Sequence, residues 1–109
     1  MMAERVLPDW AAEDQEHVIW LDDDHAVTWS SWPGETEPHG GVLWHRKPDS
    51  NWCAGSWYLH QPMYKGNPVP RENASIWTLE SKEPLTLSPS FLCHCGHHGF
   101  IRNGTWVKA

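Results

Sequence analysis

The sequence is poor in three features that mark common classes of small protein: paired cysteines, basic charge and long apolar runs. Three cysteines in 109 residues is an odd and low number, whereas a secreted scaffold of this size usually carries four, six or eight. Eight Lys and Arg against 14 Asp and Glu leave a net charge of -6, which repels phosphate backbones. We therefore expect reduced thiols and no nucleic-acid partner.

Membrane and export signals are lacking as well. No run approaches the roughly 18 to 20 apolar residues of a membrane span, and residues 1–14 are acidic, where a signal peptide is basic and then apolar. We expect a soluble, cytoplasmic protein with no membrane partner. The sequence also contains no nucleophile elbow, no phosphate-binding loop, no dinucleotide fingerprint and no His-Glu-x-x-His, so we expect no enzymatic activity.

Tryptophan is the residue that the chain has in excess. Only 39% of the residues are hydrophobic, but nine of them are tryptophans, and a lean core must draw on such large rings. Most of them are expected in the core. Partly exposed rings beside turns are typical anchors of protein interfaces, and four tryptophans lie next to predicted turns. These candidate anchors are Trp29, Trp32, Trp52 and Trp57.

Short alternating runs separated by turn residues predict a mainly β protein. Strands are expected at 17–21, 25–32, 41–45, 52–60, 75–80, 85–92, 99–102 and 105–108. Pro89 interrupts one of them and indicates an edge strand or a bulge, and Asn103-Gly104 is the strongest hairpin signal. The predicted architecture is a small single-domain sandwich or half-barrel of antiparallel hairpins.

Two segments are predicted to lie outside this sheet structure. Residues 1–16 mix helix formers with Pro8, which indicates a loose N-terminal arm with one helical turn from Asp9, ahead of a single β domain at 17–109. Residues 61–73 carry three prolines and a glycine, which predicts a long surface loop.

The chemically dense part of the chain is Cys93-His94-Cys95-Gly96-His97-His98, with two thiols and three imidazoles in six residues. Zinc favours thiolate and imidazole ligands in a tetrahedral arrangement, and a glycine after a ligand cysteine lets backbone N–H groups turn toward the sulfur. The spacing is Cys-x-Cys, one residue shorter than the usual Cys-x-x-Cys. The segment predicts three of the four ligands of a Zn²⁺ site.

The remaining ligand must come from the middle strands, which offer Cys53, His45 and His60. Cys53 is preferred because a third thiolate leaves no cysteine unexplained, and such a metal would staple the C-terminal hairpin to the central sheet. The predicted zinc ligands are Cys93, Cys95, His98 and Cys53.

Three other interpretations of the cysteines stay open. The thiols can be buried as small apolar side chains while the histidines lie in a solvated turn. A catalytic metal usually has a carboxylate base beside it, and the nearest acidic residue in sequence is Glu83. A cysteine nucleophile paired with a histidine is a further alternative, but no known local signature surrounds either thiol.

The C-terminal third, PLTLSPSFLCHCGHHGFIRNGTW (84–106), resembles a family of small actinobacteriophage proteins with a Leu-Ser-Pro-Ser and Cys-Gly-x-His-Gly-Phe-Ile pattern. A fainter likeness covers GVLWHRKPDSNWCAGS (41–56). Cys93 departs from the pattern, because the first cysteine of the family commonly stands one residue further away. The positions that match are Ser88, Pro89, Ser90, Cys95, Gly96, His98 and Gly99. The resemblance implies a phage setting and no particular activity.

Together these observations predict a small, non-catalytic, phage-encoded module that binds a host or phage protein in the bacterial cytoplasm. Missing catalytic motifs, negative charge and surplus tryptophan motivate this hypothesis. One alternative is a structural virion component, such as a capsid decoration or tail accessory protein. Another is a small metallohydrolase, which requires an open metal coordination position.

Overall fold

Strands dominate the computed structural model, which describes residues 5–14, 17–31, 34, 37–59, 63–64, 67–68, 76–93 and 95–109. The first sheet contains β1 (Ile19–Asp22), β2 (His25–Ser30), β3 (Gly40–Arg46) and β4 (Trp52–Tyr58), hydrogen-bonded in that order. The second contains β7 (Thr78–Lys82), β8 (Leu85–Leu92), β9 (His98–Arg102) and β10 (Thr105–Lys108), each paired with its neighbour. Both sheets are antiparallel meanders. The predicted mainly β architecture is confirmed.

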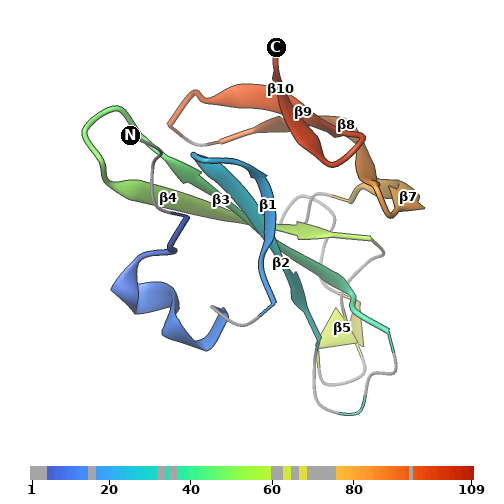
Figure 1. The fold of residues 1–109 in the computed structure, drawn as a ribbon. Coiled ribbons are helices and arrows are strands. Elements are labelled where there is room, and N and C mark those ends of the chain that lie inside the picture. Colours follow the sequence, from blue (N-terminus) through green and yellow to red (C-terminus); the bar gives the residue numbers. More distant parts are fainter. Residues whose placement is uncertain are drawn as a thin grey trace.

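The C-terminal sheet lies across one face of the N-terminal sheet (Figure 1). Between them is a core to which both sheets contribute alternate residues, as expected when one face of each strand is buried. Trp57 is the largest fully buried side chain of this core, with 1% of its surface exposed. The other members are Leu21, Val27, Leu43, Leu85, Leu87, Phe91 and Ile101.

Residues 5–14 cover the opposite face of the first sheet, below it in Figure 1. The 3₁₀ helix η1 (Asp9–Asp14) begins at the predicted residue, but the expectation of a loose arm is wrong for this segment. Leu7 and Ala11 are buried against Ala26 and Trp44. The arm packs because the outward-facing residues of β2 and β3 are apolar too, so this face also requires a cover.

The predicted turn and bulge are both present. Asn103 and Gly104 adopt positive φ angles of 51° and 73° between the paired residues Arg102 and Thr105, as a two-residue hairpin requires. The register between β8 and β9 shifts between Leu87 and Phe91, which places Pro89 in the predicted bulge.

The predicted 61–73 loop lies largely outside the described residues. Within it the structure describes two short antiparallel strands, β5 (Met63–Tyr64) and β6 (Asn67–Pro68). The candidate anchor Trp32 and the candidate ligand His60 also lie outside the described residues.

If the arm has a structural role, alanine substitutions at two neighbouring residues should differ clearly in their effect on the free energy of unfolding. Leu7→Ala should lower the free energy of unfolding by about 2–3 kcal/mol, because it removes a side chain that is 2% exposed from a packed site. Val6→Ala, at a position that is 49% exposed, should change it by less than about 0.5 kcal/mol. Urea unfolding followed by tryptophan fluorescence measures both. Equal effects would show that the arm does not contribute to the fold.

Candidate metal centre

The register of the first sheet aligns three ligand-type side chains in one row across β2, β3 and β4. His25 pairs with His45, and His45 pairs with Cys53. Residues of one strand that are two positions apart share a face, so His45 lies on the same side as the core residue Leu43. The row therefore faces the second sheet, and all three side chains are buried.

The connection between β8 and β9 brings two further thiols onto this row. The backbone N–H of Gly96 donates to the carbonyl of Cys93 at 2.8 Å, and the N–H of Cys93 donates to the carbonyl of His97, also at 2.8 Å. Gly96 has a φ of 92°, which a residue with a side chain rarely adopts. The chain therefore turns at Gly96, between Cys95 and β9.

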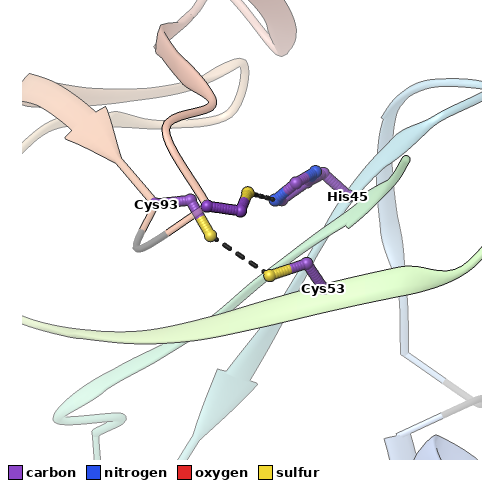
Figure 2. A group of neighbouring side chains, drawn as sticks. His45, Cys53 and Cys93 are labelled. Atoms are coloured by element: carbon purple, nitrogen blue, oxygen red, sulfur yellow. Dashed lines mark hydrogen bonds between the residues drawn. The ribbon is translucent and has the colours of Figure 1, made fainter. Parts of the chain in front are cut away.

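Four ligand atoms converge where the connection meets the sheet. One atom each from His45, Cys53, Cys93 and Cys95 lies within 4.8 Å of all the others. Cys53 Sγ is 3.2 Å from Cys93 Sγ, and Cys95 Sγ is 3.4 Å from His45 Nε2. Figure 2 shows the sulfurs of Cys53 and Cys93 pointing toward each other from β4 and from the segment after β8.

These distances suit tetrahedral coordination. Zinc–sulfur bonds of about 2.3 Å and zinc–nitrogen bonds of about 2.0–2.1 Å place neighbouring ligand atoms roughly 3.5–3.8 Å apart, close to the measured 3.2 and 3.4 Å. The three cysteines are free thiols. The four residues are compatible with a metal site.

The thiols differ in acidity because their surroundings differ. Burial, followed by the neighbouring Cys93 thiol, raises the pKa of Cys53 to about 12. At Cys95, which is exposed, a hydrogen bond from the backbone N–H of His97 stabilises the thiolate and lowers the pKa. A cation bound here would therefore displace the proton of Cys95 more easily than that of Cys53.

His98 is the predicted ligand that the structure does not bring to the cluster, and His45 takes its place. His98 is exposed, and its Nε2 lies 2.8 Å from Ser90 Oγ. Along β9 the buried positions are Gly99 and Ile101, so the alternation turns His98 to the outer face. The sequence offered His45 as an alternative ligand. Its position two residues after the apolar Leu43, and so on the same face of the strand, was the signal that could have favoured it.

A second group of rings lies beside the cluster and was missed at the sequence level. The ring of His97 lies 4.4 Å from that of His45 at 16°, measured between centroids, and 4.9 Å from that of His25 at 20°. Trp106 lies 4.5 Å from His25 at 11°, over Gly99, where any side chain would collide with the indole. Burial, and then the nearby His25, lowers the pKa of His97, which favours its neutral form.

The three candidate anchor tryptophans that the structure describes divide into core and partly buried positions. The prediction of Trp57 as an interface anchor is wrong, because the ring is fully buried between the sheets. Trp29 packs edge-on against Trp57 at 5.4 Å. Trp52 is half-buried and lies under the guanidinium of Arg46 at 4.8 Å.

Comparison of the chain with known protein families, with curated proteins and with solved structures finds no match. The resemblance to phage proteins therefore stays a prediction from the residues that carry it. Among the described residues, no helix has the length and apolarity needed to cross a bilayer.

The acidity differences predict an order of thiol reactivity in metal-free protein. At pH 7.5 iodoacetamide should modify Cys95 about tenfold or more faster than Cys53, because only the thiolate is nucleophilic, and Cys53 is both buried and high in pKa. Peptide mass spectrometry of time points gives the rates. In urea the rates should become similar. Comparable rates in the folded protein would contradict the geometry of the cluster.

Proposed function

We propose that this protein is a small, non-catalytic, protein-binding module whose two sheets are joined by a structural Cys₃His zinc site. The observation that carries the proposal is the convergence of the ligand atoms of His45, Cys53, Cys93 and Cys95 within 4.8 Å. Thiolate-rich sets with one imidazole select zinc over the hard cations, which prefer oxygen ligands.

A structural role is supported by the number and burial of the ligands. Four protein ligands complete a tetrahedral zinc sphere, whereas a catalytic zinc keeps one position for water or substrate. His45 and Cys53 are 2% and 8% exposed, so a metal bound there would be shielded from solvent on the side of the first sheet. This supports the protein-binding hypothesis over a hydrolase acting at these four residues.

The site joins parts of the chain that are far apart in sequence. Cys53 lies 40 residues from Cys93, and His45 lies 50 residues from Cys95. Closing long loops removes conformational entropy from the unfolded chain, and metal binding to a folded site adds directly to folding free energy. The part of the chain that the structure describes has a core of eight buried apolar side chains between the sheets, and such a small core benefits from a cross-link.

The surface that we propose for the partner is the arm side of the first sheet. Trp10 is 64% exposed and Val6 is 49% exposed, and Trp10 leans on Trp44 at 5.2 Å. On the same face, Trp52 lies edge-on to Trp20 at 6.1 Å and under Arg46. Tryptophan and arginine dominate interface hot spots, so a protein is the favoured partner. The bacterial cytoplasm, for a phage-encoded chain, is the proposed setting.

The zinc staple predicts a stability loss on metal removal. Protein prepared without a polyhistidine tag should contain about one tightly held zinc per chain. A strong chelator at pH 7 should lower the Tm by roughly 12 °C or more, the equivalent of about 3 kcal/mol or more for a domain of this size. Elemental analysis and calorimetry measure these quantities.

Two variants separate the staple from simple packing. Cys95→Ser removes an exposed ligand at little packing cost. This variant should have a lowered Tm whether or not chelator is present. His98→Ala, which leaves the cluster intact, should keep the wild-type melt and its chelator sensitivity. Zinc-free protein with an unchanged melt in chelator would refute the staple and leave the cysteines as packed side chains.

The proposed partner surface predicts that Trp10→Ala abolishes retention of a specific protein from host lysate while leaving the Tm unchanged. The reason is that truncating a central aromatic anchor costs about 2 kcal/mol or more of binding free energy. Leu92→Ala, at a residue of β8 that is 70% exposed, is the matched control on the other sheet. Equal retention by wild type and the Trp10 variant would count against this surface.

A further inference from the structure

A carboxylate and two imidazoles, those of Asp22, His25 and His97, form a chain beside the four-residue cluster, against which the ring of His97 packs at His45. Asp22 Oδ1 accepts a hydrogen bond from Nδ1 of His25 at 2.8 Å. On the other side of that ring, His25 Nε2 lies 2.7 Å from His97 Nε2. The two nitrogens therefore point at each other across the two sheets.

This arrangement has the features of a metal-binding histidine pair. A ligand histidine usually gives its other ring N–H to a carboxylate, which fixes the tautomer and raises the basicity of the ligand nitrogen. Asp22 provides that contact to His25, so Nε2 of His25 carries a lone pair directed at His97. A hydrogen bond between the rings requires a proton on one of the two Nε2 atoms, and a cation can replace that proton once His97 carries its proton on Nδ1.

The open side of the pair is a polar cleft. A cavity of about 570 Å³ is lined by both rings together with Asp24, Arg46, Ser50 and Cys95, among other residues. The opposite side of His25 is covered by Trp106. A cation held by two imidazoles would thus be shielded on one side and would complete its sphere with water on the other.

We propose that His25 and His97 form a second, exchangeable site for a divalent transition-metal ion of the zinc, nickel or copper class, with Asp22 as the residue that orients His25. Imidazole suits these ions, and two protein ligands give much weaker binding than four. Tetrahedral coordination at about 2.0–2.1 Å requires an N···N distance of about 3.3 Å, so on binding the rings separate by roughly half an ångström and tilt until both lone pairs converge on the ion. The site goes beyond the structural staple and does not depend on its being zinc.

The test is a titration of untagged apo-protein with Co²⁺ alone, followed by absorption spectroscopy and calorimetry. The first equivalent should produce the intense thiolate-to-cobalt band of the cysteine cluster. The second should bind at least about 100-fold more weakly and add no thiolate band, because its ligands are imidazoles. His25→Gln and His97→Gln should each abolish the second equivalent and keep the first, and Asp22→Asn should weaken the second 10- to 100-fold.

His98→Ala is the matched control, because His98 is an exposed histidine that contacts Ser90 instead of this chain. It should retain both equivalents. Binding of only one equivalent by wild type, or a second equivalent that survives both His25→Gln and His97→Gln, overturns the second site. Absence of the thiolate band at the first equivalent counts only against the Cys₃His site. Failure of that site can therefore be distinguished from failure of the His25–His97 site. The ring of His97 also packs on the cluster ligand His45, so a His97 variant has to be checked for an intact cluster. A retained thiolate band shows that the cluster is assembled and that the variant is folded.

Discussion

The rest of the structure depends on one contact, in which the β8–β9 connection meets the end of β3 and the start of β4. It places Cys93 and Cys95 on the His45–Cys53 pair and so holds the two sheets together at one end of the sandwich. The apolar core holds them at the other positions. Neither sheet alone contains the four ligand atoms, so the cluster exists only when the sandwich is assembled.

Burial on both faces of the first sheet explains the unusual use of tryptophan. The inner face packs Trp57 against the second sheet, and the outer face packs Trp44 under the arm. The indole N–H of Trp44 donates to Thr28 Oγ1 at 3.0 Å, which satisfies its polar atom in the buried layer. A chain with few aliphatic residues thus covers both faces of one sheet with large rings, and the arm is part of the fold for the same reason.

The cluster and the histidine pair share the same end of the sandwich and the same cleft, which His45 and Cys95 line together with His25 and His97. They differ in the number of protein ligands, four in the cluster and two in the pair. A closed coordination sphere suits a fixed structural ion, and an open one suits exchange with solvent. The proposed structural site and the proposed exchangeable site therefore lie next to each other in one small domain.

Local patterns in the sequence determined the strands of the two four-stranded sheets, the Asn103-Gly104 hairpin and the bulge at Pro89, because each depends on neighbouring residues and on backbone conformations that few residue types adopt. The sequence also singled out all three thiols of the cluster. What only the tertiary structure decided was the choice of imidazole, the packing of the arm and the Asp22–His25–His97 chain. These depend on which face of a strand meets which sheet and on the register between strands, and a shift of one residue reverses every face. His98 and Trp57 were assigned wrongly for that reason: their neighbours in sequence resemble a site and a turn, but the pleat turns one side chain outward and buries the other.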